Sequence, residues 1–326
     1  MKKIIISLYC VLQFSFLSFS QDTITIYYNN DWEEISESAD AEFYRKTYVH
    51  DNLKYACDYY KSGQLQMSGT YLLKNDKMKQ GHFKYYYENG QVKSEGEYKA
   101  DKAEGLWKYF YESGKIKAEG ETINGNNEGF WVYWHENENK KSEGEFIHDK
   151  KEGPWSYWYE NGQKELEGSF INNMFNGKWV AYYKNGNMQY SGQFKEDYPY
   201  GLWDYWFETG IQKAQGQKDG DKKLGTWKHW YSNAQLESEE SYENGLIKSA
   251  KGYHQNGQFY FVGEYRKGKR HGEWKYWNAD GRLFYKGSFR KGIKEGQWMR
   301  YFQDGEMKLI YKKGEIINKR IGGVIT

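Results

Sequence analysis

The sequence contains very little cysteine and proline and few hydrophobic residues. Its 326 residues include 2 Pro and 2 Cys, Cys10 and Cys57, and only 38% are hydrophobic, which is below the usual share for a globular domain. Cys10 lies in the N-terminal leader considered below, so the mature chain has one thiol and no internal disulfide. We interpret Cys57 as a half-buried small hydrophobe. Long apolar runs are also missing after the leader, which excludes a multi-span membrane protein.

Aromatic residues and glycine are abundant instead. Aromatic residues make up 20% of the chain, with 33 Tyr, 17 Phe and 14 Trp, and there are 36 Gly. This content argues against disorder, because disordered chains are poor in aromatic residues. Tyr and Trp favour strands, where the ring packs and the polar tip reaches water. The composition therefore predicts β structure whose interior is made of rings.

The first twenty residues have the pattern of a secretory signal peptide. Lys2 and Lys3 precede an uncharged, mostly apolar stretch over 4–19, and Ser18 and Ser20 place small residues before Gln21. This pattern predicts cleavage before Gln21 and export to the periplasm, the cell envelope or the medium. The alternative is an N-terminal membrane anchor, because 4–19 is only slightly shorter than a membrane span.

A 24-residue repeat organises most of the chain. Seven glycines follow one another at this spacing, each with an aromatic residue two positions later, and the series resumes for two more units. The first pair is Gly81 and Phe83. The repeat-defining pairs that follow are Gly105 and Trp107, Gly129 and Trp131, Gly153 and Trp155, Gly177 and Trp179, Gly201 and Trp203, Gly225 and Trp227, Gly272 and Trp274, and Gly296 and Trp298. With two degenerate units, about eleven copies lie between residues 53 and 315, which indicates a repeat architecture.

Each repeat reads as a β-hairpin. Trp107, Tyr109 and Tyr111 alternate with other residues at a period of two, which is typical of a strand. The turn that follows is Asn-Gly in several copies, as in 88–91 and 160–163, and this dipeptide predicts a type I′ hairpin turn. The returning strand contains a glycine, Gly120 and its equivalents. We expect a large ring from the adjacent hairpin to pack over this missing side chain.

The predicted fold class is all-β: an elongated, single-layer, twisted antiparallel sheet of about eleven stacked hairpins, a 24-residue repeat solenoid. The predicted organisation is a signal peptide at 1–20, an N-terminal cap segment at 21–52, the repeat array at 53–315 and a C-terminal tail at 316–326. In the cap segment we expect a strand over 23–28 and a short helix over 36–46. The tail is either a frayed end or a last strand.

The repeated string Gly-x-Trp-x-Tyr-aromatic-Tyr-x-Asn-Gly, with its later strand glycine, resembles the MORN-repeat family. The 24-residue period is similar to the bacterial variant form, which is often labelled antitoxin-like. The resemblance covers about residues 53–315 and implies a single elongated sheet of stacked hairpins. It also implies non-catalytic scaffolding and partner binding, or lipid contact as in some eukaryotic members.

The residues that could carry chemistry form no catalytic or metal-binding pattern. The seven His show no metal-ligand spacing, and His135 and His229 stand at aromatic positions of their repeats. Glu95, Glu119 and Glu143 recur at the repeat period, and we expect them to pair with Lys on neighbouring strands. No glycine loop precedes a helix, as a phosphate-binding loop would. We therefore predict a protein that is not an enzyme, with no cofactor and no metal.

The second face of each first strand also carries rings, and we predict that it binds a partner. The candidate binding surface consists of Trp134, Trp158, Tyr182, Trp206, Trp230 and Trp277. The leading hypothesis is an exported scaffold for an unknown protein or envelope component, and the chain is expected to be a monomer. The alternatives are a carbohydrate-binding module that uses the aromatic rows and a toxin-neutralising protein.

Charge distribution suggests one further kind of partner. The chain has 47 Lys and Arg against 45 Asp and Glu, but residues 264–320 contain 16 basic and 7 acidic residues. This basic stretch is a candidate for contact with an anionic membrane surface. Nucleic acid is not expected as a partner, because the charge of the whole chain is close to balanced.

Overall fold

The computed structural model describes residues 23–36 and 38–322. The predicted signal peptide at 1–20 lies outside these residues, as does the end of the predicted tail, 323–326. The described chain divides into two compact units, which are considered separately. The N-terminal unit contains residues up to 104 together with 112–114, and the C-terminal unit contains 105–111 and the residues from 115 onward.

The all-β prediction is confirmed. The described residues form 27 strands in an open sheet, every pairing is antiparallel, and no α-helix occurs among these residues. The N-terminal unit contains β1 (Ile24–Tyr28), β2 (Glu34–Ile35), a 3-10 turn (Ser38–Asp40), β3 (Phe43–His50), β4 (Leu53–Tyr60), β5 (Leu65–Leu72), β6 (Asn75–Lys79), β7 (Gly81–Tyr86) and β8 (Val92–Lys99).

The remaining strands belong to the C-terminal unit, apart from the first three residues of β9. They are β9 (Lys102–Phe110), β10 (Ile116–Ile123), β11 (Asn126–Trp134), β12 (Lys140–Ile147), β13 (Lys150–Trp158), β14 (Lys164–Ile171), β15 (Met174–Tyr182), β16 (Met188–Lys195), β17 (Tyr198–Trp206), β18 (Gln212–Asp219), β19 (Lys222–Trp230), β20 (Leu236–Glu243), β21 (Leu246–Tyr253), β22 (Phe259–Arg266), β23 (Lys269–Trp277), β24 (Leu283–Arg290), β25 (Ile293–Phe302), β26 (Gly305–Lys312) and β27 (Glu315–Gly322).

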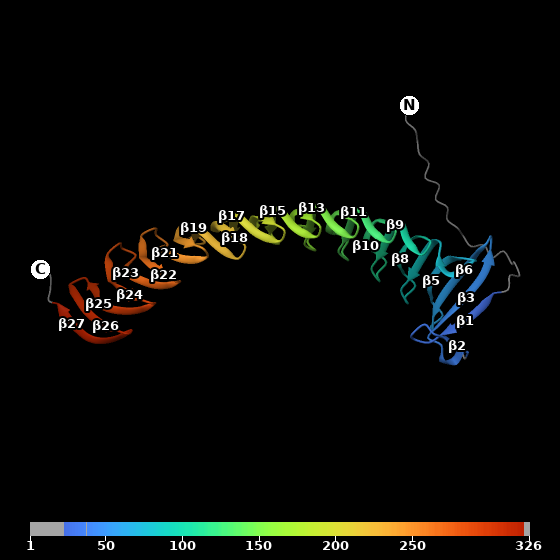
Figure 1. Ribbon diagram of the computed structural model, residues 1–326, viewed down its shortest axis with the longest axis horizontal. Coiled ribbons are helices and arrows are strands. Elements are labelled where there is room, and N and C mark those ends of the chain that lie inside the picture. Colours follow the sequence, from blue (N-terminus) through green and yellow to red (C-terminus); the bar gives the residue numbers. More distant parts are fainter. Residues whose placement is uncertain (1–22, 37, 323–326) are drawn as a thin grey trace, which may run out of the picture. The chain divides into compact units, whose positions relative to one another are not determined.

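The predicted hairpins are present in the predicted number. Eleven hairpins follow one another in the described chain from β4/β5 to β25/β26, and the first strand of the second hairpin is interrupted between β6 and β7. Within the C-terminal unit the hairpins are stacked in chain order (Figure 1). Each returning strand pairs with the first strand of the next hairpin, as β12 does with β13.

The helix expected over 36–46 is absent. A 3-10 turn occupies Ser38–Asp40, and β3 begins at Phe43. Phe43, Tyr44 and Thr47 belong to aromatic and β-branched types, which fit a pleated surface better than a helix. Because β3 pairs with β4 along its whole length and with β1 on its other side, this segment continues the sheet. At the other end, the part of the predicted tail up to Gly322 is a strand, β27, paired with β26.

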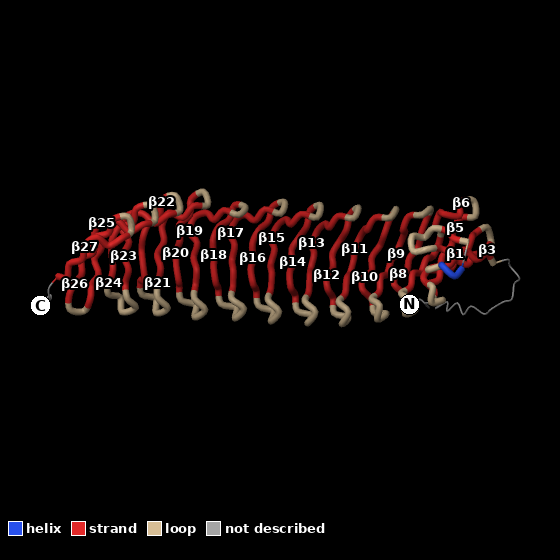
Figure 2. Tube along the Cα trace, turned by 90° about the horizontal axis from the view of Figure 1, so that it is seen from below, coloured by secondary structure: helices blue, strands red, loops and turns tan. Residues whose placement is uncertain are grey.

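The turns at the two ends of the strands differ: the loops at one end are longer than those at the other (Figure 2). The turn within a hairpin has three residues, as in Glu160, Asn161 and Gly162, and only the glycine has a positive φ, of 83°. The predicted type I′ turn at Asn-Gly is therefore wrong: three-residue loops of this kind combine a type I turn with a left-handed residue. Turns of two left-handed residues join successive hairpins instead, as at Asn172 and Asn173, with φ of 51° and 69°.

The core lies on one face of the sheet and is built from the repeat-defining aromatic residues. The eight Trp from Trp107 to Trp298 that follow the first glycine of each repeat are 0–4% exposed. Trp155 lies over Gly144, and a Cβ built on that glycine would meet the indole within 3.0 Å. The same holds for Gly120, Gly168, Gly192, Gly216, Gly263 and Gly287 with the Trp of the next hairpin. The predicted packing of a ring over the strand glycine is confirmed.

A single sheet buries these rings because its strands bend. The glycine two residues before each Trp has a φ between +60° and +74°. The strand pairing shifts register at this glycine: Trp155 of β13 pairs with Gly144 of β12, but the next residue of β12, Glu145, pairs with Glu152. A β-bulge with such a glycine bends the strand. In β13 the Lys151 Nζ donates to the hydroxyl of Tyr157 at 2.8 Å. Six residues of straight strand would separate these residues by about 20 Å, so the strand folds over Trp155.

Candidate functional site

The predicted binding rings lie at the end of the first strand of each hairpin. We call Trp134, Trp158, Tyr182, Trp206, Trp230 and Trp277 the aromatic row. All six side chains are half-buried, unlike the enclosed Trp of the core. Two observations place the row on the face that carries the repeated glutamates: the Tyr182 hydroxyl donates to Glu167 Oε1 at 2.6 Å, and Lys140, which pairs with Glu143, lies 5.8 Å from the ring of Trp158.

The backbone under the aromatic row is fixed by the previous repeat. The hydroxyl of Tyr159 donates to the carbonyl oxygen of Tyr182 at 2.8 Å, and Tyr183 does the same to Trp206 at 2.9 Å. His135 uses Nε2 for the equivalent contact with the Trp158 carbonyl at 2.8 Å, which agrees with its interpretation as a substituted ring. A hydrogen bond that links two neighbouring hairpins therefore positions five of the six row residues, and at Trp230 the equivalent side chain of the previous repeat is Phe207, which has no donor.

Charged side chains flank the aromatic row. Glu119 lies 3.9 Å from Lys108 on the neighbouring strand, as expected. Glu143 and Glu167 instead bind Lys140 and Lys164 of their own strand, at 2.7 and 2.6 Å. Because Lys164 and Tyr182 both donate to its carboxylate, the pKa of Glu167 is lowered. Burial and the same carboxylate raise the pKa of Tyr182 to about 12.

Sequence reasoning missed a second set of apolar side chains on this face. They occupy the middle position of the Gly-x-Trp motif and therefore point away from the core. Leu106, Phe130 and Leu202 are 55%, 54% and 50% exposed. Their cross-strand neighbours are polar: Phe130 lies opposite Glu145, and Leu202 lies opposite Gln217. The motif itself is the signal that could have found them, because alternation places its middle residue outside.

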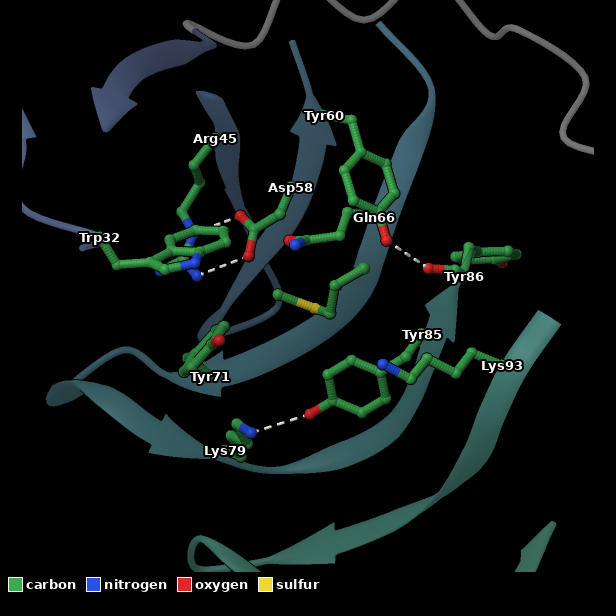
Figure 3. Close-up of a pocket in the computed structure, with 11 residues that line it drawn as sticks. Trp32, Arg45, Asp58, Tyr60, Gln66, Tyr71, Lys79, Tyr85, Tyr86 and Lys93 are labelled. Atoms are coloured by element: carbon green, nitrogen blue, oxygen red, sulfur yellow. Dashed lines mark hydrogen bonds and ion pairs between the residues drawn. The ribbon is translucent and has the colours of Figure 1, made fainter. Parts of the chain in front are cut away.

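The N-terminal unit contains a pocket that the sequence did not predict. It has a volume of about 360 Å³, within the range of about 300–1,000 Å³ that is usual for ligand sites. Arg45, Asp58, Met67 and Tyr85 form its floor, because they lie opposite one another across β3, β4, β5 and β7. The other lining residues are Trp32, Tyr60, Gln66, Tyr71, Lys79, Tyr86 and Lys93 (Figure 3).

An ion pair fixes the floor of this pocket. Arg45 Nε and Nη2 donate to the two carboxylate oxygens of Asp58 at 2.6 and 2.8 Å, and Asp58 is only 3% exposed. The carboxylate stabilises the guanidinium and raises the pKa of Arg45. Burial raises the pKa of Tyr71 and of Tyr85. Both phenols therefore remain protonated at neutral pH and can donate hydrogen bonds.

Other reactive groups are not assembled into a site. No cluster of three or more His, Cys, Asp or Glu that could hold a metal ion occurs within 23–36 and 38–322. In the same part of the chain, no helix is long and apolar enough to cross a membrane. Cys57 is a free, half-buried thiol, and burial raises its pKa.

Comparison with known proteins matches the repeat to a family. The MORN repeat variant matches residues 79–100, 103–124, 151–172, 175–196, 223–244 and 270–291. The chain belongs to the MORN-repeat family. The segments between these matches carry the same features, as in Gly129 and Trp131 or Gly201 and Trp203. MORN repeats form a non-catalytic family of scaffolds that bind proteins or other ligands.

Further comparisons gave distant structural similarities. The crystal structure of TcdB2-TccC3 shares 10% identity over 88% of this MORN-repeat chain and 17% of that chain, with a TM-score of 0.18. The Photorhabdus luminescens Tc holotoxin pore shares 9% identity over 90% of this chain and 18% of that chain, also with a TM-score of 0.18. The chain thus spans less than a fifth of either protein. A search of curated proteins found no match.

Proposed function

We propose that this MORN-repeat chain is an exported, non-catalytic scaffold that binds a partner protein of the cell envelope through the aromatic row. The observation that carries the proposal is the repetition of one surface. Successive hairpins present a half-buried ring, a Lys–Glu pair and an outward middle residue of the Gly-x-Trp motif on the face opposite the core.

This combination of side chains suits a protein partner. Protein interfaces are enriched in Trp and Tyr at their centre, and charged groups lie at the rim. A half-buried ring loses little conformational freedom on binding, because its neighbours already restrict it. Several such rings at a constant spacing allow one partner to make the same contact repeatedly, so that modest individual contacts add to a large affinity.

Export and monomeric state are parts of the same proposal. The leader at 1–20 predicts export, and the basic stretch 264–320 offers a second contact with an anionic membrane surface. A glycan partner would use the same rings and is distinguished by the experiment below. A toxin-neutralising role would require the chain to remain in the cytoplasm. A mature N-terminus at Gln21 in the exported fraction therefore supports the scaffold, and an uncleaved cytoplasmic chain supports the toxin-neutralising role.

The experiment is site-specific photo-crosslinking in cells that produce the protein. A photoreactive residue at position 158 or 206 should capture one partner, which mass spectrometry identifies, and the purified partner should bind the full chain. Replacing Trp134, Trp158 and Trp206 by Ala should weaken this binding at least a hundredfold, since interface hot spots cost about 2 kcal/mol or more each. The matched control replaces Ile123, Ile147 and Ile171, which are 43–49% exposed and also repeat every 24 residues.

The outcomes separate the candidates clearly. Full loss of binding in the Trp variant, with normal binding in the Ile variant, supports the proposal. Equal loss in both variants, or no loss in either, contradicts it. Capture of a polysaccharide instead of a protein favours the carbohydrate-binding alternative.

A further inference from the structure

We propose that the pocket of the N-terminal unit binds an acidic sugar, a pyranose ring that carries a carboxylate. The pocket is separate from the aromatic row, because its lining residues are Trp32, between β1 and β2, and ten residues of the strands β3–β8. It combines three features that such a ligand needs: flat rings, fixed hydrogen-bonding groups and an excess of positive charge.

Trp32 supplies an exposed ring at the edge of the pocket. Its side chain is 38% exposed, and its indole stacks on Phe43 with ring centroids 4.7 Å apart and planes 10° apart. Its φ of 60° is unusual for a bulky residue. The Asn29 side chain holds this turn, since its Oδ1 accepts from the backbone of Asp31 and Glu33 at 2.9 Å each. Strained backbone that its surroundings hold in place is frequent at ligand-binding sites.

Aromatic faces and paired polar groups are arranged around the same space. In Figure 3, Trp32 and Arg45 lie on one side of the pocket, and Tyr86 and Lys93 lie on the other. The carbon-bound hydrogens of a sugar ring pack against such faces, as apolar groups do. Sugar hydroxyls can donate to the carboxylate of Asp58 and can exchange hydrogen bonds with the amide of Gln66, which both line the pocket.

The charge of the lining selects an anion. Arg45 and Asp58 neutralise each other through their double hydrogen bond, which leaves the positive charges of Lys79 and Lys93 among the lining residues. The Lys79 Nζ is held by the Tyr85 hydroxyl at 2.8 Å and lies 4.6 Å from the ring of Tyr98. A carboxylate placed between the two lysines would gain charge-assisted hydrogen bonds. A cationic ligand would be repelled by them.

The test is calorimetric titration of the full chain with glucuronate and galacturonate oligosaccharides, with a neutral glucose oligosaccharide of equal length as the reference. A uronate should bind and the neutral sugar should bind at least tenfold more weakly. Trp32→Ala should abolish uronate binding, and Lys93→Gln should weaken it at least tenfold, because a charge-assisted hydrogen bond to the carboxylate is lost. Circular dichroism checks that both variants are folded.

Lys117 offers a matched control for Lys93. It stands at the equivalent position of the next repeat, and each ammonium lies close to a tyrosine ring, at 5.7 Å for Lys117 and 5.8 Å for Lys93. Lys117→Gln should leave uronate binding unchanged. Equal affinity for uronate and neutral sugar, absence of uronate binding, or equal effects of Lys93→Gln and Lys117→Gln would overturn the proposal.

The aromatic row provides the second control. The variant that lacks Trp134, Trp158 and Trp206 should bind uronate normally, since none of these residues lines the pocket. Loss of uronate binding in this folded variant would assign the sugar to the row and refute the pocket. Partner binding through the row and uronate binding in the pocket can therefore fail independently.

Discussion

The substitution Gly168→Ala tests how the core of the repeat is packed. Gly168 is a strand glycine of β14, and its φ lies outside the left-handed region, so alanine fits its backbone. The added Cβ would meet the indole of Trp179 within 3.0 Å. Trp179 is 1% exposed and donates from Nε1 to the Ser169 carbonyl at 3.1 Å. The ring therefore has no room to move without losing this hydrogen bond.

We expect this substitution to destabilise the pairing of β14 with β15, which joins two neighbouring hairpins, by about 3 kcal/mol. Overpacking a core by one methyl group costs about 1–3 kcal/mol, and the lost hydrogen bond adds about 0.5–1.5 kcal/mol. Repeat proteins open locally, so the assay is hydrogen exchange of the backbone amides in β14 and β15. This measurement gives the free energy of local opening for these two strands.

The cause is isolated by a double-mutant cycle with Trp179→Ala. Once the ring is removed, Gly168→Ala should cost almost nothing, so the two substitutions should show a coupling energy of about 3 kcal/mol. Gly177→Ala is the control: a Cβ there meets nothing within 4 Å, although the φ of +74° is strained for alanine. It should destabilise without coupling to Trp179→Ala. Equal coupling for Gly168 and Gly177 would refute ring-over-glycine packing.

Three other predictions follow from single contacts. Tyr159→Phe removes the hydrogen bond to the Tyr182 carbonyl and should lower the free energy of local opening by about 0.5–1.5 kcal/mol, measured by hydrogen exchange with an unaffected distant hairpin as control. Asp58→Asn leaves the Arg45 charge without its partner and should lower the free energy of unfolding by about 3 kcal/mol in urea titrations; an unchanged midpoint would contradict a structural ion pair. The neighbouring His229 imidazole, 3.5 Å away, and a hydrogen bond from Tyr242 lower the pKa of Glu240 from 4.5 to about 2. Its stabilising contribution is complete above pH 4.5 and is lost as the pH falls toward 2, so Glu240→Gln should lower the Tm at pH 5 and have little effect at pH 2.

The sequence predicted the repeat, the strand class and the place of the core rings, because these depend on a local pattern copied many times. One repeat lacks both the strand glycine and the Trp that packs over it. Glu240 stands where the other repeats have the strand glycine, and its cross-strand neighbour Ala250 stands where they have Trp. The space left by the missing indole accommodates a carboxylate, which Tyr242 binds at 2.6 Å.

The features that sequence reasoning missed are not repeated or depend on distant contacts. The predicted type of the Asn-Gly turn was wrong because the Asn161 side chain makes hydrogen bonds that the sequence pattern does not reveal. Its Oδ1 accepts from the backbone N–H of Gln163 at 3.0 Å, and its Nδ2 donates to the carbonyl oxygen of Lys184 in the next repeat at 2.8 Å. The pocket was missed because Arg45, Asp58 and Tyr85 come from strands whose register only the fold defines. The residue pattern along one strand does not show which side chains lie side by side across four neighbouring strands.

Hydroxyl-radical footprinting of the tryptophans by mass spectrometry, with and without the crosslinked partner, tests directly whether the aromatic row is the binding face. The free protein should show rapid oxidation at Trp134, Trp158 and Trp206 and slow oxidation at the core residues Trp155 and Trp179. The partner should protect the first three and leave the two core residues unchanged. Protection of another surface, with no change in oxidation along the aromatic row, would contradict the assignment of that row as the binding face.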